Sequence, residues 1–210
     1  MKEKTKIKFI PLTNDILFKD TYSRKENRKY LEDLLECYYG YPRGFLKDKL
    51  KVSHEVTLDK YKYHDKNIRS DLVIIVDDKI KLDIEMYSSF NDESKKKSKY
   101  YAMRIYSTQL KAGDAYNQIG KVTQINFVDN VKLEISEEIK STVYIDDDFE
   151  QDYVRLDVAR KIDYTNSRFI KYLRFLGSRS REERSKYALG DEIMTSLDKW
   201  LEWYTNTDSL

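Results

Sequence analysis

The segment KIKLDIEMYSSF, residues 79–90, constrains the fold more strongly than any other part of the chain. In an extended strand, successive side chains point to opposite faces of the sheet. The even-numbered positions from 80 to 86 are all apolar, so one face of this strand is predicted to lie in a core. The odd-numbered positions carry Lys79, Lys81, Asp83, Glu85 and Tyr87. The second face is therefore either a solvated surface or the floor of a metal site. Asp83 is expected to form a surface ion pair with Lys81, and the alternative is a supporting or second-metal carboxylate.

The segments around this strand predict a mixed sheet with flanking helices. Residues 69–87 are typical of a β-hairpin with its turn at Asp77–Asp78. Further strands are expected at 51–63, 121–129, 141–147 and 153–160. Helices are expected from Asn14 or Thr13 up to Gly40, from 92 to near Gly113, and from Asn166 to the end. This order of elements indicates an α/β (α+β) fold built on one mixed central sheet.

Length and composition exclude several classes of protein. A chain of 210 residues is long enough to bury a real core, and 6 glycines with 2 prolines argue against a loop-rich or repeat fold. No apolar run approaches the roughly 20 residues that span a bilayer, and the N-terminus lacks the features of a secretory signal. Cys37 is the single cysteine, so no internal disulfide is expected. We therefore predict a cytoplasmic protein with no membrane partner.

Two carboxylates are candidates for chemistry. The predicted hairpin would bring Asp71, at the start of its first strand, close to Glu85, near the end of its second. Carboxylate oxygens are the ligands that Mg²⁺ or Mn²⁺ prefers. Such an ion lowers the pKa of a bound water and neutralises charge on a phosphodiester. Pairs of carboxylates are also common on solvated surfaces, so spacing alone leaves both alternatives open.

Several ordered motifs carry a family resemblance. The segment DKNIRSDLVIIVDDKIKLDIEM, residues 65–86, resembles the core of the PD-(D/E)XK nuclease superfamily. More narrowly, it looks like the recombination-promoting nuclease/transposase (Rpn) family, in which a lysine and an aspartate precede a hairpin that ends in an IEMQ-like string. NDILFKDTY, residues 14–22, resembles that family's opening motif, and residues 97–129 resemble the helix and strand after its hairpin. The resemblance covers roughly residues 9–130, with a weaker similarity up to about residue 175.

The resemblance implies a restriction-endonuclease-like αβββαβ core, with DNA as the substrate and a divalent metal at one end of the sheet. Asp71 and Glu85 would hold Mg²⁺, or Mn²⁺ or Ca²⁺ in its place. Asp15 would supplement that site, and Lys19 and Lys66 would contact phosphates. Residues 1–165 would form the nuclease-like domain, and residues 166–210 a helical extension packed on it.

Tyr87 departs from the superfamily pattern. The third position of the motif is lysine in the superfamily and usually glutamine in this family, whereas a tyrosine hydroxyl is neutral near pH 7. Either Lys81, Lys66 or Lys19 supplies the missing positive charge, or the site is degenerate. Lys81 lies about 13 Å from Glu85 along an extended strand, which is a long reach. We therefore include Tyr87 among the candidate site residues without assigning it a role.

The helix after the hairpin is basic and could follow a DNA backbone. Its candidate DNA-binding residues are Lys95, Lys96, Lys97, Lys99 and Arg104. Lys97 stands where relatives tend to have arginine, which keeps the charge but loses bidentate phosphate geometry. DNA is the expected partner, and a second copy of the chain or a related longer nuclease are further candidates.

These observations lead to one functional prediction and one alternative. The prediction is a Mg²⁺-dependent DNA endonuclease of the Rpn, transposase-associated type, acting in DNA recombination or in defence against mobile elements. The alternative is a catalytically degenerate relative that binds DNA or a partner nuclease without cleaving.

Overall fold

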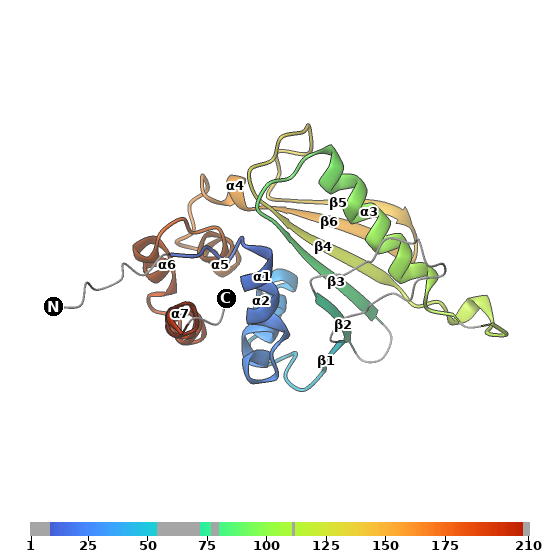
Figure 1. Cartoon of the computed structure of the whole chain (residues 1–210), viewed down its shortest axis with the longest axis horizontal. Coiled ribbons are helices and arrows are strands. Elements are labelled where there is room, and N and C mark those ends of the chain that lie inside the picture. Colours follow the sequence, from blue (N-terminus) through green and yellow to red (C-terminus); the bar gives the residue numbers. More distant parts are fainter. Residues whose placement is uncertain (1–8, 54–71, 77–79, 111, 208–210) are drawn as a thin grey trace.

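The computed structural model describes residues 9–53, 72–76, 80–110 and 112–207 of the chain. Within these ranges six strands form one sheet, in the order β1-β2-β3-β4-β6-β5 (Figure 1). The strands are β1 (Leu50–Ser53), β2 (Leu72–Val76), β3 (Ile80–Tyr87), β4 (Val122–Val128), β5 (Lys140–Asp146) and β6 (Phe149–Arg155). Strands β3, β4 and β6 run parallel, and the other neighbours pair antiparallel. The predicted mixed sheet is confirmed.

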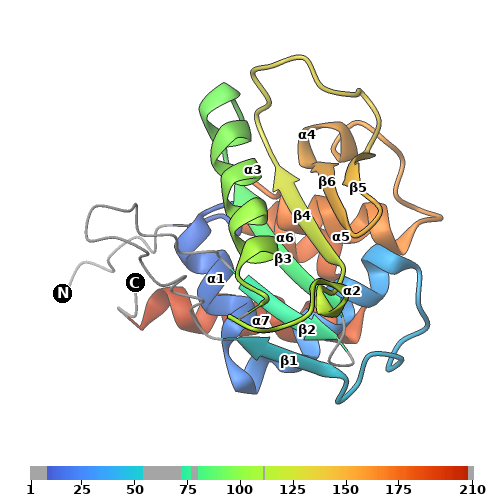
Figure 2. The same cartoon turned by 90° about the vertical axis from the view of Figure 1, so that its right-hand side faces the viewer.

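Helices cover both faces of this sheet. They are α1 (Asp15–Ser23), α2 (Arg28–Tyr39), α3 (Asp92–Ser107), α4 (Leu156–Ala159), α5 (Arg168–Leu176), α6 (Arg181–Ala188) and α7 (Glu192–Asn206), with short 3₁₀ turns at η1 (Lys25–Asn27) and η2 (Tyr116–Gln118). Helices α1 and α2 lie on one side of the sheet and α3 on the other (Figures 1 and 2). The expected order of elements, with an αβββαβ core, is confirmed.

Local sequence signals set the ends of the first helices. The Asn14 side chain accepts a hydrogen bond from the Leu17 amide at 2.9 Å, so Asn14 rather than Thr13 caps α1. Gly40 follows α2 with a φ of 72°, a left-handed conformation that glycine adopts without a steric cost.

Two predicted boundaries are wrong. Helix α3 ends at Ser107, well before Gly113, and the Thr108 hydroxyl lies 3.3 Å from the carbonyl of Ile105, an acceptor in the last turn of the helix. The strand predicted at 153–160 begins at Phe149 and ends at Arg155. Its partner β4 ends at the pair Val128–Arg155, so the chain beyond has no strand to join and forms α4. The hairpin turn at Asp77–Asp78 and residues 54–63 lie outside the described residues.

The main apolar core lies between the sheet and the helices on the α1 side. The ring of Phe18 in α1 is 6.2 Å from that of Phe127 in β4. The same buried cluster continues into α5, where the Tyr172 hydroxyl lies 3.3 Å from the Tyr22 hydroxyl. Helices α5–α7 therefore share a core with α1, α2 and the sheet. The division of the chain at residue 165 stays a prediction.

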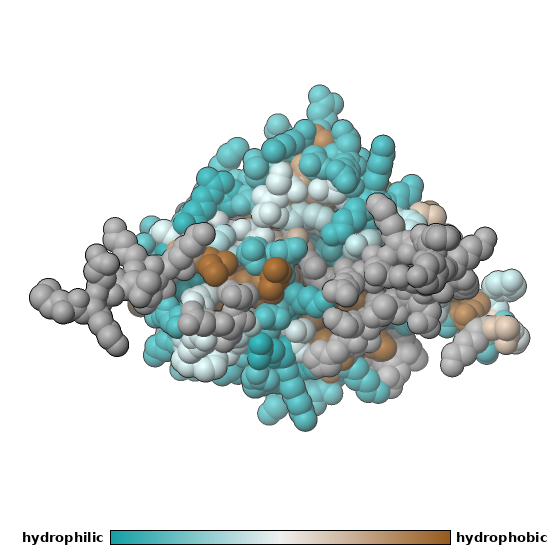
Figure 3. Space-filling view, viewed as in Figure 1, coloured by the Kyte–Doolittle hydropathy of each residue, from teal (hydrophilic) through white to brown (hydrophobic). Residues whose placement is uncertain are grey.

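The surface of the protein is mostly hydrophilic on the face shown in Figure 3, where apolar residues appear as small patches. None of the helices in the described ranges is long and apolar enough to cross a bilayer.

An ion-pair cluster joins α2 to the C-terminal helices. Asp33 of α2 is 1% exposed, and it pairs with Arg168, the first residue of α5. Arg43 Nε lies 3.5 Å from the same carboxylate, and Arg43 also pairs with Asp191 at the start of α7. Because these charges come from three separated segments, they fix the position of α5 and α7 against α2.

We predict that Asp33→Ala lowers the free energy of unfolding by about 2 kcal/mol, because it removes the charged acceptor of buried hydrogen bonds. Urea denaturation measures this change. Glu202→Ala is the matched control, since Glu202 and Arg181 form an interhelical pair at 3.2 Å whose side chains are more than a third exposed. The control should cost less than about 1 kcal/mol. Equal effects of the two variants would contradict the anchoring role of Asp33.

Candidate functional site

The polar face of β3 is buried beneath α3. Gln124 of β4 donates to Asp83 at 2.7 Å and to the backbone carbonyl of Ser98 in α3 at 3.1 Å. Tyr87 lies beneath Lys97 of the same helix. Because side chains alternate along a strand, Glu85 shares this face. Asp83, Glu85 and Tyr87 are 0%, 1% and 7% exposed, so this face is not a solvated surface.

Glu85 lies near the carboxyl end of the parallel strand β3, opposite Asn126 in β4. Ligands of open α/β sheets bind at the carboxyl ends of the strands. A carboxylate in such a buried position costs free energy unless cations, hydrogen bonds or a metal compensate its charge. Glu85 therefore has the position and the donor atoms of a metal ligand.

Asp71 and Lys66, the other residues expected at this site, lie outside the described residues. Asp71 directly precedes Leu72 in the sequence, and Leu72 pairs with Ile84, the neighbour of Glu85. The roles predicted for Asp71 and Lys66 stay predictions.

A buried layer of polar side chains lies between α3 and the sheet, and we call it the Ser98 layer. Its members are Ser98, Gln124, Asn126 and Gln151, each at most 3% exposed. The Ser98 hydroxyl lies 2.7 Å from Gln124 Oε1 and 2.8 Å from Asn126 Oδ1. Gln151 donates to the Ser98 hydroxyl at 3.2 Å. These bonds satisfy polar groups that would be costly to bury alone, and they fix the first half of α3 over β4 and β6.

The sequence did not single out the three amides of this layer. The available signal was the spacing of Gln124 and Asn126, two polar residues two positions apart in a strand with apolar neighbours. The interpretation of Asp83 as part of a surface ion pair with Lys81 is wrong. Asp83 is fully buried, because α3 covers it and Gln124 supplies its hydrogen bond.

Tyr87 belongs to an aromatic cluster at the same end of the sheet. Its ring centroid is 5.2 Å from that of Phe90, which in turn is 5.5 Å from Tyr153. Val128 completes this cluster of buried residues. Burial raises the pKa of Tyr153, and a hydrogen bond with Ser98 opposes the shift. The ring of Tyr87 thus has a packing role, and its place among the candidate site residues stays a prediction.

Lys97 is the predicted DNA contact that the structure brings next to this face. Its Nζ lies 5.7 Å from the centroid of the Tyr87 ring and 5.1 Å from that of Tyr101. Both distances are within the range of a cation–π interaction. The ammonium group is therefore held between two rings, beside the face that carries Glu85.

The other basic residues of α3 lie elsewhere on the helix. At 3.6 residues per turn, Lys95 and Lys99 share the flank of Tyr106, whose ring stacks on Phe149 of β6 at 5.6 Å. Lys96 points away from the sheet by the same geometry. Arg104 shares the flank of Lys97, but seven residues place it about 10 Å farther along the axis. The predicted DNA-binding set of α3 is thus divided between three sides of the helix.

Asp15 and Lys19 lie on α1, on the opposite side of the sheet from α3 (Figure 2). Asp15 is exposed at the first position of the helix, and its Oδ1 accepts from the Ile16 amide at 2.9 Å. The structure does not bring these two residues to the face of Glu85. Lys81 does share that face by alternation, and burial lowers the pKa of its ammonium group.

The donor set fits a divalent cation in part. Glu85 offers carboxylate oxygens, which suit Mg²⁺, Mn²⁺ and Ca²⁺. The described portion of the chain contains no group of three or more His, Cys, Asp or Glu residues that could hold a metal. A complete ligand set therefore requires Asp71 or another group from outside the described ranges.

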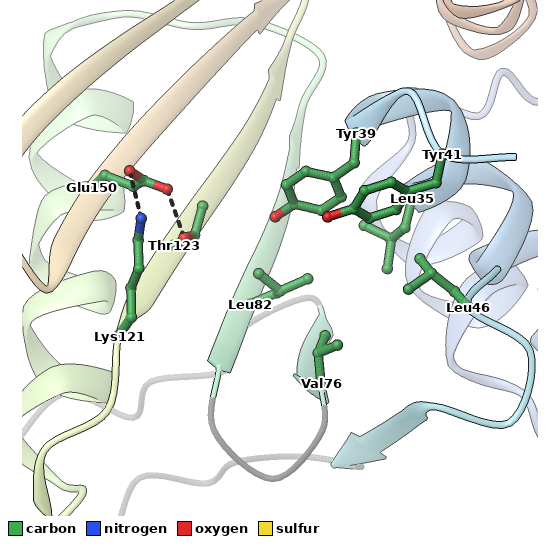
Figure 4. A pocket seen from close by; sticks show the side chains of 9 residues that line it. All are labelled: Leu35, Tyr39, Tyr41, Leu46, Val76, Leu82, Lys121, Thr123 and Glu150. Atoms are coloured by element: carbon green, nitrogen blue, oxygen red, sulfur yellow. Dashed lines mark hydrogen bonds and ion pairs between the residues drawn. The ribbon is translucent and has the colours of Figure 1, made fainter.

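A separate cavity of about 140 Å³ lies on the α2 side of the sheet (Figure 4). Tyr39 and Tyr41 form one wall, and their hydroxyls point towards β3. At the other end, Lys121 pairs with Glu150 at 3.1 Å, and Thr123 donates to the same carboxylate at 2.8 Å. Because Glu150 is the lone carboxylate among the lining residues and is already paired, this cavity does not resemble a metal site.

The chain belongs to the PD-(D/E)XK nuclease family transposases: the family model of that description matches residues 12–209. Comparisons with curated proteins and with solved structures gave no match. The resemblance found in the sequence motifs is confirmed, and the match extends through α5, α6 and α7. The fold and the family together define a nuclease-type protein.

We predict that Gln124→Leu lowers the free energy of unfolding by about 2 kcal/mol, because it leaves buried polar groups of the Ser98 layer without a partner. Urea denaturation again measures the change. Gln118→Leu, the same substitution at an exposed position of η2, should change stability by less than about 0.5 kcal/mol. A Gln124→Leu variant as stable as this control would show that the layer does not hold α3 in place.

Proposed function

We propose that this protein is a metal-dependent DNA endonuclease that hydrolyses phosphodiester bonds at the Glu85 end of β3. The observation that carries the proposal is the burial of Glu85, at 1% exposure, on a polar strand face at the carboxyl end of a parallel strand. Membership of the PD-(D/E)XK nuclease family transposases supports the same reaction class.

We propose Asp71 and Glu85 as the metal ligands and Mg²⁺ as the metal. Asp71 adjoins Leu72, whose pairing with Ile84 supports a position close to Glu85. When bound, a divalent ion there would lower the pKa of a water molecule and neutralise charge on the scissile phosphate. In the reaction, the water oxygen forms a bond to phosphorus, the bond from phosphorus to the leaving sugar oxygen breaks, and that oxygen takes up a proton.

The residues of the chain would hold the metal ligand Glu85 in place and would exclude water from the site. Glu85 is fixed because its strand is hydrogen-bonded on both sides, to β2 and to β4. The aromatic cluster of Tyr87, Phe90 and Tyr153 fills the space beyond it with apolar groups. A rigid, partly dry site strengthens the electrostatic interactions within it. DNA would approach along α3, whose exposed lysines include Lys95, Lys96 and Lys99.

One observation favours a second function. Tyr87 occupies the next position on the face of Glu85, and it packs into the aromatic cluster instead of presenting a charge. A site without a cation at that position would bind DNA, or a partner nuclease, without cleaving it. This degenerate relative is the alternative that the next experiment separates from the nuclease.

We predict that the purified protein nicks supercoiled plasmid in Mg²⁺ or Mn²⁺, and that EDTA abolishes the reaction. Glu85→Gln should lower the rate about a thousandfold, because it removes a charged ligand worth several kcal/mol to the transition state. Agarose gel electrophoresis of nicked and linear plasmid gives the rate. Asp71→Asn should give a loss of the same order.

Glu93→Gln is the matched control, since Glu93 is exposed in the first turn of α3. It should leave the rate unchanged. Thermal unfolding of each variant shows whether a lost rate reflects a lost fold. No nicking by the parent together with nicking by Tyr87→Gln would mean that the core is silenced at one residue. If every variant is inert but the parent binds DNA, the non-cleaving alternative holds.

A further inference from the structure

The cavity between α2 and the sheet is separate from the Glu85 site. Its floor is a row of side chains on three neighbouring strands, Leu82 of β3, Thr123 of β4 and Glu150 of β6, which the strand register places side by side. Neighbouring strands lie about 4.8 Å apart, so the row is about 10 Å long. The row is apolar at Leu82 and charged at Glu150. Leu82 and Glu85 point to opposite faces of β3, because they are three residues apart in an extended strand.

Two tyrosines form the wall of the cavity on the α2 side. The rings of Tyr39 and Tyr41 stack with their centroids 5.5 Å apart, and both hydroxyls point towards β3 (Figure 4). The two residues are 37% and 41% exposed, so this wall borders the solvent. A tyrosine hydroxyl can both donate and accept a hydrogen bond. A ligand that enters beside this wall therefore meets polar groups from α2 as well as from the sheet.

The size and the remaining lining of the cavity favour one aromatic ring. Leu35, Leu46 and Val76 complete an apolar lining around the floor. The volume is about 140 Å³, and an apolar cavity of about 150 Å³ in another protein accepts benzene. Mostly apolar cavities with a few convergent polar groups are the usual form of a small-molecule site. A single six-membered ring thus fits the cavity better than two fused rings do.

The polar end of the cavity offers an acceptor and carries no net charge. Lys121 Nζ lies 3.1 Å from Glu150 Oε2, and the Thr123 hydroxyl donates to Glu150 Oε1 at 2.8 Å. A carboxylate has about four lone-pair positions, and these two contacts use one on each oxygen. Glu150 can therefore accept a further hydrogen bond from a ligand. Because Lys121 already balances the charge of Glu150, a neutral N–H donor is favoured over a cation.

These features together describe one kind of nucleobase. A nuclease-type protein meets nucleotides and DNA strands, whose bases are neutral aromatic rings. Cytosine is a single ring with an amino donor beside ring acceptors, and acceptance from its amino group is the usual pairing of a glutamate with this base. Adenine has a similar edge but two fused rings. Uracil and thymine have a carbonyl in place of the amino group, which a carboxylate repels.

We propose that this cavity binds a cytosine base, whose amino group donates to Glu150 and whose ring lies over Leu82 beside the tyrosine wall. A free nucleotide and an unpaired cytosine of a DNA strand share this chemistry. The sugar lies at the exposed side of Tyr39 and Tyr41, where a nucleotide or a strand has room to continue. The inference goes beyond the nuclease function proposed above and does not require that the Glu85 site cleaves DNA.

The test is a calorimetric titration of the whole chain with deoxycytidine and with deoxyuridine, which differs in carrying the carbonyl instead of the amino group. Deoxycytidine should bind with a Kd below about 1 mM. Deoxyuridine should bind at least about tenfold more weakly, because its carbonyl leaves Glu150 without a donor. A short single-stranded oligodeoxycytidine distinguishes the two sources. If it binds more tightly than the nucleoside, the site takes a DNA strand, and equal affinity assigns the site to the free nucleotide.

Glu150→Gln tests which residue reads the amino group. The amide can donate to the carbonyl of uracil, so the preference for deoxycytidine over deoxyuridine should fall at least about tenfold. Glu93→Gln is the matched control, since Glu93 is exposed on α3, and it should keep the preference of the parent. Binding of the oligonucleotide should depend on Glu150 in the same way. A residue with only a structural role would change both affinities together and leave their ratio unchanged.

Val76→Phe tests the place of binding, because the larger side chain occupies the cavity that Val76 lines. It should weaken deoxycytidine binding at least about tenfold. Val143→Phe, the same substitution at a residue of β5 that is 48% exposed, should leave binding unchanged. Thermal unfolding shows whether each variant folds. If Val76→Phe does not, Tyr39→Ala removes part of the wall at a partly exposed position and should weaken binding in its place.

Three results would overturn the proposal. The first is no binding of deoxycytidine or of the oligonucleotide up to about 10 mM base. The second is equal affinity for deoxycytidine and deoxyuridine, which would make the cavity an unspecific apolar space. The third is unchanged binding in folded Val76→Phe or Tyr39→Ala, which would place the base elsewhere. A parent that binds deoxycytidine but does not nick plasmid would contradict the nuclease function alone, so the two failures are distinguishable.

Discussion

The hydrogen bonds of the Ser98 hydroxyl with Gln124 and Asn126 determine where α3 lies on the sheet. A polar contact of this kind is directional, whereas apolar side chains could pack in several registers. The polar contact of Ser98 fixes the rotation of α3 about the helix axis, because the Ser98 hydroxyl must point at the side-chain amides of Gln124 and Asn126. That rotation places Lys97 over Tyr87 on one flank and directs Lys95 and Lys99 towards β6 on the other.

The two faces of the sheet differ in the side chains that they carry and in the interactions that those side chains make. The face towards α1 and α2 carries Leu82, Ile84 and Met86, and its core continues into α5–α7. The face towards α3 carries Asp83, Glu85 and Tyr87 and is held by hydrogen bonds and aromatic packing. The larger apolar core thus lies on one face of the sheet, and the buried polar groups of β3 lie on the other. This separation is what allows charged residues to be buried in a small fold.

The sequence predicted much of this arrangement, and its failures have physical reasons. The alternation in residues 80–87 gave the two faces of β3, and Asn14 and Gly40 gave the ends of α1 and α2 correctly. The end of α3 was placed near Gly113 because glycine is the strongest local signal, but the helix ends sooner, at Ser107, where the Thr108 hydroxyl lies 3.3 Å from the Ile105 carbonyl. Strand β6 was extended too far because local propensity carries no information on where its partner β4 ends. Asp83 looked like a surface residue because charge suggests exposure.

By itself, the sequence determined the order of the elements, the polar face of β3 and the family to which the chain belongs. These follow from side-chain periodicity and from motifs, which are local properties of the chain. Only the tertiary structure decided which distant residues meet at that face. Asp15 and Lys19, both in the opening motif, lie across the sheet, whereas Lys97 lies beside Tyr87, and Asn126 of the Ser98 layer lies opposite Glu85. The physical reason is that packing of helices on a sheet depends on contacts between residues far apart in sequence, which no local pattern encodes.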